Sequence, residues 1–168
     1  MIKAMICNPG NMKKIMFICH GNICRSPMAE FIFKDMVSKC GRENEFFIVS
    51  RATSTEEIWN GVGNSVYPGA KRELAKHGIS CEGKSARQLS RSEYCEYDYL
   101  ICMDDNNVRN SLRIFGGDPD GKVCKMMDFT SRPGNVSDPW YTDDFETAYK
   151  DIYEGCKCLL ERFALDNN

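Results

Sequence analysis

The amino-acid sequence predicts a three-layer α/β fold, with a parallel sheet of about four strands and helices on both faces. Short apolar runs alternate along the chain with segments of helical periodicity, which is typical of parallel β-α-β units. The chain has 168 residues, of which 42% are hydrophobic, as in ordinary globular domains. No repeat or linker divides the sequence, so we expect a single domain over residues 13–168. Residues 1–12 carry little pattern and are predicted to form a flexible N-terminal extension.

Four apolar runs are predicted to be the strands. In chain order they are Ile15–Ile18, Phe46–Val49, Tyr99–Met103 and Val123–Met126. The helical patterns between them cover Pro27–Lys39, Val66–His77 and Asp105–Phe115. This Rossmann-like alternation places ligands at the carboxyl ends of the strands. We therefore expect a functional site after the first strand, with Asp104 reaching the same edge.

Local signals mark the ends of several helices. Ser26-Pro27 is typical of a helix start, and His77-Gly78 of a helix end. Residues 90–93 read Ser-Arg-Ser-Glu, which is a capping-box signature for a further short helix. The last helix is the clearest, because its apolar residues keep helical spacing on one face. They are Phe145, Ala148, Tyr149, Ile152, Tyr153, Cys156, Leu159, Leu160 and Phe163.

The charge balance limits the possible partners. The formal net charge is −2, whereas general binding to nucleic acid or to a membrane surface favours a strongly basic chain. No segment resembles a membrane span. We therefore expect no nucleic-acid and no membrane partner, and any positive potential must be local.

Ten cysteines could indicate a disulfide framework, but other features argue against one. The chain exceeds the size of small disulfide scaffolds, and its cysteine spacings lack disulfide or zinc regularity. Cys156 and Cys158 are two positions apart in a helical pattern, so they point to different sides and make a poor metal pair. Residues 1–7 are too short for a signal sequence, and Pro9-Gly10 interrupts them. We predict a reducing, cytoplasmic location, with no metal and no cofactor.

Residues 19–26 carry the most informative motif. They read Cys-His-Gly-Asn-Ile-Cys-Arg-Ser, directly after the first predicted strand and before a helical pattern. Such a loop can point successive backbone N–H groups inward, and the following helix adds its positive end. Arg25 supplies a planar fork for two oxygens, and Cys19 at the base of this cup is favoured as a thiolate. A nucleophile beneath a phosphate indicates a phosphatase, although a buried cysteine beside a tight turn is the simpler alternative.

A second motif lies before the last helix, at residues 138–141. Phosphoryl transfer needs a proton donor for the leaving oxygen, and Asp138 on a stiff loop can provide one. Pro139 restricts the backbone, while Trp140 and Tyr141 offer a flat wall for an aryl leaving group. Alone, Asp-Pro is more often a turn than an acid. Together with the cysteine loop it favours hydrolysis of an aryl phosphate.

With these two motifs in place, the chain resembles the low-molecular-weight protein tyrosine phosphatase family. The similarity runs from about Lys13 to about Phe163, in the order of the family. It is carried by Cys19–Pro27, Ser50–Ser54, His77–Ile79, Ala86–Leu89, Asp98–Asp104 and Asp138–Tyr141. The first and last of these motifs together are highly specific.

The resemblance implies a two-step mechanism. Cys19 attacks phosphorus and forms a phosphocysteine, while Arg25 and the loop amides bind the phosphate oxygens. Asp138 protonates the leaving phenolate and then takes a proton from the attacking water. Ser26 donates its hydroxyl to the Cys19 thiolate. The implied phosphate-binding loop residues are His20, Gly21, Asn22, Ile23, Cys24 and Ser26.

Two further roles follow from the resemblance, and each has a simpler alternative interpretation. Asn22 and Ser50 support the loop, although Ser50 fits equally well as a strand-end serine. Cys24 is the redox partner that forms a disulfide with oxidised Cys19 and so protects the nucleophile, or it is only a small buried thiol.

Specificity is expected to come from the rim of the pocket. Trp59, Trp140 and Tyr141 are predicted to stack on a phosphotyrosine ring, although either tryptophan could instead belong to the core. Related bacterial enzymes that act on phosphoarginine carry a threonine at the position of Ile23, so an apolar residue there favours phosphotyrosine. A phosphotyrosine-containing protein is thus the predicted substrate, and a monomer the expected state.

Three residues depart from the pattern of the family. His20 replaces an apolar residue and either stabilises the thiolate or faces solvent. Arg51 replaces a small residue and either contacts substrate or is solvated. Val49 stands where some relatives have an acid that pairs with the histidine equivalent to His77, so we predict that His77 is structural.

Competing functions have the same fold or the same loop. Arsenate reductases use further cysteines to pass a disulfide outward, but Cys81 and Cys95 are too far apart in sequence for the close pair that such enzymes need. A protein arginine phosphatase is the alternative that Ile23 disfavours. A non-catalytic phosphate-binding redox sensor would be expected to lack one of Cys19, Arg25 and Asp138, and all three are present.

Overall fold

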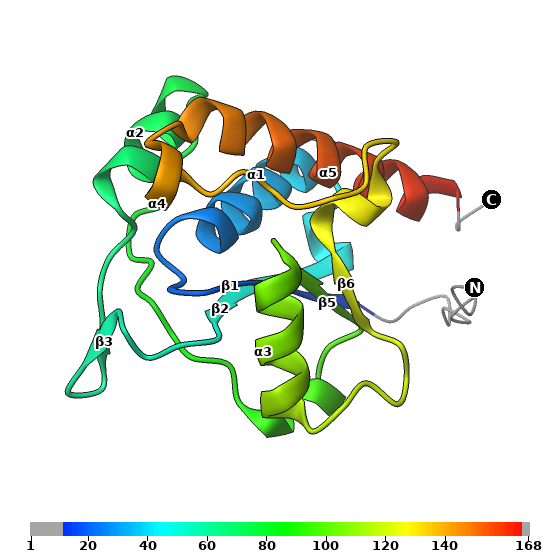
Figure 1. The fold of residues 1–168 in the computed structure, drawn as a ribbon. Helices are drawn as coiled ribbons and strands as arrows, with labels where there is room; N and C mark the ends of the chain where they lie inside the picture. The colour runs from blue at the N-terminus through cyan, green and yellow to red at the C-terminus, as the bar shows by residue number, and fades with distance from the viewer. Residues whose placement is uncertain (1–11, 166–168) are drawn as a thin grey trace.

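Four short apolar runs pair into one parallel sheet in the computed structural model, which describes residues 12–165 (Figure 1). The strands are β1 (Lys13–Cys19), β2 (Phe46–Ala52), β5 (Tyr99–Cys102) and β6 (Val123–Lys125), in the order β2-β1-β5-β6. The four predicted strands are confirmed, with ends that differ slightly from the prediction. β6 ends before Met126 because that residue begins a short 3-10 helix, η3 (Met126–Phe129). The predicted extension lies outside the described residues except for residue 12, and it stays a prediction.

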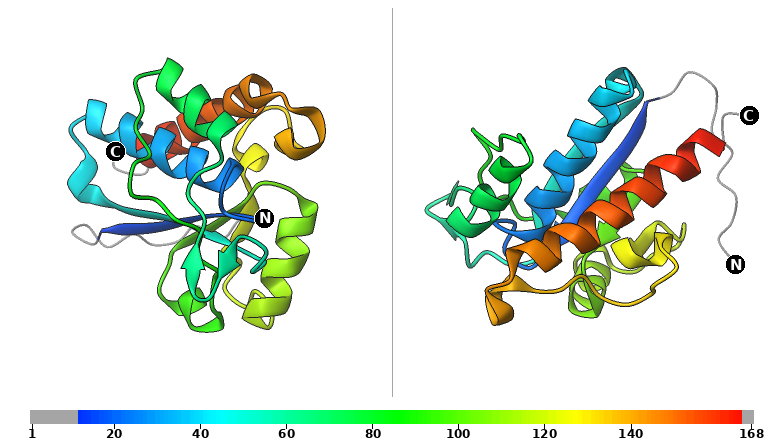
Figure 2. Two further views of the ribbon diagram at one scale, coloured as in Figure 1. Left: turned by 90° about the vertical axis from the view of Figure 1, so that its left-hand side faces the viewer. Right: turned by 90° about the horizontal axis from the view of Figure 1, so that it is seen from above.

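Helices cover both faces of the sheet, which confirms the three-layer prediction (Figure 2). On one face lie α1 (Arg25–Lys39), α2 (Pro68–Lys76) and α5 (Phe145–Leu165), and on the other α3 (Asp105–Phe115) with the short 3-10 helix η2 (Arg91–Cys95). Alternate residues of β1 serve the two layers: Ile15 and Phe17 belong to the larger core, and Met16 and Ile18 to the smaller.

The predicted helices are found, and their ends have local causes. α1 begins two residues earlier than predicted, at Arg25. α2 begins at Pro68 rather than Val66, because proline suits the first turn of a helix. The capping box at residues 90–93 is present, with the side chain of Glu93 accepting the backbone N–H of Ser90 at 2.8 Å. No helix within residues 12–165 is both long and apolar enough to cross a membrane.

Several short elements were not predicted from the sequence. β3 (Ile58–Trp59) and β4 (Val62–Gly63) form a hairpin, whose turn residues Asn60 and Gly61 both have positive φ, 48° and 76°. Asn-Gly is the preferred pair for such a turn. Before the last helix, α4 (Pro139–Thr142) is a single turn that begins at the Asp138 cap. A short 3-10 helix, η1 (Glu43–Glu45), precedes β2.

The carboxyl ends of the central strands meet at one edge of the sheet. Cys19 at the end of β1 pairs in register with Ala52 of β2, and Ile18 with Cys102 of β5. Asp104 follows β5 and caps α3, so it emerges at the same edge as Cys19. Cys19 and Asp104 therefore lie at the carboxyl edge of the sheet, where the sequence predicts the functional site.

Candidate active site

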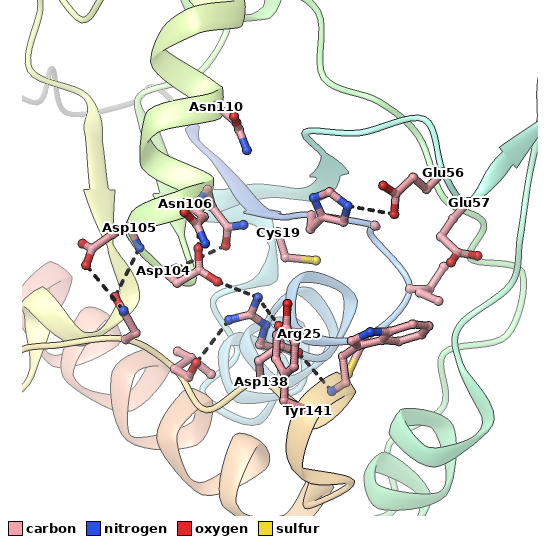
Figure 3. A pocket seen from close by; sticks show the side chains of 18 of the residues that line it. Cys19, Arg25, Glu56, Glu57, Asp104, Asp105, Asn106, Asn110, Asp138 and Tyr141 are labelled. Atoms are coloured by element: carbon pink, nitrogen blue, oxygen red, sulfur yellow. Dashed lines mark hydrogen bonds and ion pairs between the residues drawn. The ribbon is translucent and has the colours of Figure 1, made fainter.

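A cavity of about 800 Å³ opens at the carboxyl ends of β1 and β5. Its walls come from the loop between β1 and α1, the segment after β2, the first turns of α3, and the segment that leads into α4 (Figure 3). The lining includes Cys19, Arg25 and Asp138, which the two motifs single out. Chain segments more than a hundred residues apart therefore contribute to one site.

The loop of residues 20–24 is held from behind by the side chain of Asn22. This residue has a left-handed backbone conformation, with φ of 57°, which asparagine tolerates better than most residues. Its Oδ1 accepts the backbone N–H of Arg87 at 3.1 Å, so its Nδ2 faces the other way and donates to Ser26 Oγ at 2.8 Å and Ser50 Oγ at 2.9 Å. Asn22 and Ser50 are buried, and they position the loop rather than line the cavity.

Behind Ser50 lies a group of buried charges that the sequence motifs do not predict. Ser50 Oγ donates to Glu30 Oε2 at 2.5 Å, and Lys84 Nζ lies 3.4 Å from the same oxygen. Lys84 Nζ and Arg51 Nη1 both donate to the Ser50 carbonyl, at 3.1 and 2.9 Å, and Arg51 Nε pairs with Glu93 at 3.0 Å. Burial lowers the pKa of Lys84. Arg51 thus neither contacts the cavity nor faces solvent, and instead supports the strand behind the loop.

Cys19 lies at the base of the cavity and is buried. Its Sγ is 3.0 Å from Ser26 Oγ. Ser26 Oγ accepts hydrogen bonds from Cys19 Sγ and Asn22 Nδ2 and donates to the Arg51 carbonyl, which is 3.4 Å away. If the Cys19 thiol loses its proton, the same hydroxyl can donate to Sγ instead. α1 begins at Arg25, directly after this loop, and the first N–H groups of a helix have no partner within the helix. The Ser26 hydroxyl, in the first turn of α1, therefore lies beside the Cys19 sulfur.

Arg25 is buried with its guanidinium between two carboxylates. Nη2 donates to Asp104 Oδ2 at 2.7 Å and to Asp138 Oδ2 at 3.2 Å, and Nη1 donates to the Val136 carbonyl at 3.1 Å. Burial opposes the charge, but Cys19, Asp138 and Asp104 outweigh it and raise the pKa of Arg25 above its ordinary value. Three of its five N–H donors are used in these bonds, which leaves two for an oxyanion.

Asp138 stands at the start of α4, with its side chain partly exposed to the cavity. Its Oδ1 accepts the backbone N–H of Trp140 at 3.1 Å and so caps the short helix, while Oδ2 contacts Arg25. The cap fixes the direction of the carboxyl group, and Pro139 in the first turn stiffens the backbone. A proton on this carboxyl group would face the same cavity as the Cys19 sulfur.

Two of the three aromatic residues that were predicted at the rim line the cavity. Trp140 and Tyr141 line the cavity and are 76% and 85% exposed, so they form an open wall (Figure 3). Ile23, His20, Gly21 and Cys24 also line it. Trp59 is 79% exposed on β3 and is not among the lining residues. Trp59 thus lies on the β3–β4 hairpin, outside the set of residues that line the cavity.

Two acidic residues after β2, Glu56 and Glu57, line the cavity and were not predicted from the sequence motifs. Glu56 Oε2 lies 2.9 Å from His20 Nε2, and both side chains are more than half exposed (Figure 3). Glu57 Oε2 accepts from Asn64 Nδ2 at 2.7 Å. The signal that could have found these acids is their position just beyond the carboxyl end of β2, at the functional edge of the sheet. His20 therefore faces the cavity mouth, in contact with Glu56.

Cys24 shares the cavity with Cys19, at the residue before α1. Burial, and to a lesser extent Cys19, raises the pKa of its thiol far above the ordinary range, which keeps it protonated. The described residues contain nine cysteines, and all are free thiols. Cys81 is buried and Cys95 exposed, and neither lines the cavity.

His77 has partners that fit a structural role. Its ring stacks on Tyr149 of α5, with the centroids 3.8 Å apart and the planes at 5°. Its Nε2 is 3.5 Å from the buried Glu73. These contacts join the end of α2 to α5 and lie outside the cavity.

Comparisons of the sequence and of the structure with known proteins all match the same protein family. The sequence model of the family described as low molecular weight phosphotyrosine protein phosphatase matches residues 14–168. Over 151 residues the chain is 36% identical to the low molecular weight protein-tyrosine-phosphatase YfkJ of Bacillus subtilis, covering 89% of this chain and 94% of that protein. It is also 36% identical over 158 residues to the low molecular weight phosphotyrosine protein phosphatase of Gallus gallus, covering 91% and 97%. The crystal structure of YfkJ from Bacillus subtilis is similar to this fold with a TM-score of 0.88, at 32% identity, covering 96% of this chain and 100% of that one.

Proposed function

Because the chain belongs to the low molecular weight phosphotyrosine protein phosphatase family, we propose that it hydrolyses phosphotyrosine in proteins, and small aryl phosphates, through a phosphocysteine on Cys19. The observation that carries this proposal is the meeting of Cys19, Arg25 and Asp138 in one cavity. A nucleophile, an oxyanion-binding cation and a proton donor are the groups that the reaction requires.

In the first step, the Cys19 thiolate attacks phosphorus in line with the leaving phenolic oxygen. The inward-facing N–H groups of residues 20–25 and the two remaining donors of Arg25 bind the equatorial oxygens as charge moves onto them. Asp138 donates its proton to the phenolic oxygen as the P–O bond breaks. The products of this step are the free phenol and the phosphocysteine.

In the second step, Asp138 acts as a base toward water. Water loses a proton to the Asp138 carboxylate and attacks phosphorus, and the P–S bond breaks to release inorganic phosphate. The Ser26 hydroxyl, 3.0 Å from Cys19 Sγ, stabilises the departing thiolate. Asn22 and Ser50 keep the Ser26 hydroxyl and the loop in place.

The cavity suits an aryl phosphate. Trp140 and Tyr141 form an open aromatic wall next to Asp138, and Ile23 adds an apolar contact. An apolar side chain at residue 23 offers no hydrogen bond to a phosphorylated guanidinium, which disfavours phosphoarginine. Cys81 and Cys95 lie outside the cavity, which disfavours disulfide relay from arsenate.

A role for Cys24 is part of the proposal. Cys24 condenses with oxidised Cys19 to form a disulfide, releasing water from the sulfenic acid and protecting Cys19 from irreversible oxidation. The place of Cys24 in the same cavity as Cys19 supports disulfide formation, whereas the protonated state of the Cys24 thiol slows it.

We also propose that the protein is a cytoplasmic monomer that requires no cofactor, acts on phosphorylated proteins, and binds neither nucleic acid nor membranes.

The proposed activity is tested by the hydrolysis of p-nitrophenyl phosphate between about pH 4 and pH 8. We expect turnover by the reduced protein, none by Cys19→Ser, and greatly slowed turnover by Asp138→Ala. Absence of turnover by the native protein would contradict the proposal, and arsenate reduction would then be measured with the same preparation.

A further inference from the structure

The mouth of the cavity also has a wall of charged and polar side chains. His20 follows the nucleophile, and its carbonyl accepts hydrogen bonds from Ser54 N at 3.0 Å and Ser54 Oγ at 2.9 Å. Its side chain reaches Glu56, with Nε2 and Oε2 2.9 Å apart, and both residues line the cavity (Figure 3). The contact between His20 and Glu56 is therefore fixed to the phosphate-binding loop itself.

Glu57 adds a second carboxylate to this wall. A side chain on Gly21 would bring its Cβ within 3.1 Å of Glu57 Cγ, so the absence of a side chain there lets the glutamate lie against the loop. Its carboxylate accepts from the Asn64 amide, which has no charge to offset it, and its carbonyl accepts from Asn64 N at 2.8 Å. The wall thus holds two carboxylates and one imidazole.

The other carboxylates of the cavity already have cationic partners. Asp104 and Asp138 both contact Arg25, and Asp105 lies 2.9 Å from Lys125. Glu56 and Glu57, by contrast, pair with no lysine or arginine of residues 12–165, so their negative charge is not offset by a neighbouring cation of that kind. Glu56 is 71% exposed, so a charge on an incoming peptide can approach it.

On the opposite side of the mouth, α3 contributes a cation. Arg109 lines the cavity, and its guanidinium hydrogen-bonds the Asn106 amide of the same helix. A phosphotyrosine that enters the cavity places its neighbouring residues against this rim. The phosphate is anionic, so acids at the mouth disfavour binding unless the rest of the substrate brings positive charge.

We propose that Glu56, with Glu57 beside it and His20 bound to it, is a specificity-determining residue that selects phosphotyrosine flanked by lysine or arginine. The long stems of lysine and arginine let their charged heads reach an exposed rim. This inference rests on the proposed phosphatase activity and adds the chemistry of the preferred substrate. Acidic flanking residues are rejected by the same wall, so discrimination comes from repulsion as well as attraction.

The test compares kcat/KM for two phosphotyrosine peptides that differ only in the residues on both sides of phosphotyrosine. One carries lysines and the other glutamates. At low ionic strength we expect the native protein to prefer the lysine peptide by about tenfold, because each exposed pair contributes modestly and several act together. In the Glu56→Gln/Glu57→Gln variant we expect the preference to fall to about twofold or less. Added salt should reduce the preference of the native protein.

The control variant is Glu82→Gln. Glu82 is an exposed glutamate that pairs with Lys71 outside the cavity, so the native preference should be kept. Equal rates on the two peptides, or a preference that survives in the double glutamine variant, would overturn the inference. Hydrolysis of p-nitrophenyl phosphate by the native protein separates the two proposals: turnover without peptide preference defeats this inference alone, and no turnover defeats the proposed function.

Discussion

Replacing Asp138 with asparagine would remove the proposed proton donor while keeping the backbone around it. The amide oxygen of asparagine can accept the Trp140 N–H that Asp138 Oδ1 accepts now at 3.1 Å, and asparagine is also a good helix cap. α4 and its two aromatic residues should therefore keep their positions. Arg25 would lose its 3.2 Å contact with the carboxylate but keep the 2.7 Å contact with Asp104.

The expected loss follows from the role of the acid. General acid catalysis contributes about a hundredfold to ten-thousandfold, so we expect kcat for phenyl phosphate to fall by about two to three orders of magnitude. The KM should not rise, because the change removes an anion near the bound phosphate. The loss should be smaller for p-nitrophenyl phosphate, whose leaving group needs less help from a proton.

Steady-state kinetics on the two substrates provide the assay, with Asp143→Asn as the control. Asp143 lies at the other end of α4 in a left-handed conformation that asparagine also adopts, so this variant should behave like the native protein. Equal slowing of the two substrates by Asp138→Asn, or a loss below tenfold on phenyl phosphate, would refute the role of Asp138 as the acid.

Three further substitutions test other parts of the site. Cys24→Ser should keep native turnover when reduced, but dithiothreitol should no longer restore activity after hydrogen peroxide, because no disulfide can form; full recovery would contradict the switch. Trp140→Ala should raise the KM for p-nitrophenyl phosphate by about threefold to tenfold through loss of the aromatic wall, whereas Trp59→Ala, outside the cavity, should not change it. Asp104→Asn should lower kcat/KM by about tenfold, since Arg25 loses its 2.7 Å charged hydrogen bond, and an unchanged value would show that Asp138 and Val136 suffice to hold Arg25.

The architecture and the centre of the site could be predicted because their signals are local. The alternation of apolar runs with helical patterns predicts the parallel sheet, and a parallel sheet gathers the carboxyl ends of its strands at one edge. Cys19 ends a strand and Asp138 begins a short helix, so both motifs carry their own structural context.

The position of Trp59 and the burial of Glu30 were not predicted, for two different reasons. Trp59 was predicted at the rim because its aromatic side chain could stack on a phosphotyrosine ring. The two-residue strands of its hairpin are too short to show periodicity, so the hairpin was not predicted, although Asn60-Gly61 marks its turn. Glu30 lies in a helical pattern, where a charge is normally solvent-facing. Its burial is explained by Ser50 and Lys84, which are distant in sequence, together with Lys34 one turn along the helix.

The covalent intermediate is the central claim, and it can be observed directly. The native protein would be mixed with p-nitrophenyl phosphate, quenched with acid during turnover, digested and analysed by mass spectrometry. We predict one phosphoryl group on the peptide that contains Cys19, and none in Cys19→Ser. A phosphoryl group on another residue, or turnover with no phosphorylated peptide, would contradict the mechanism.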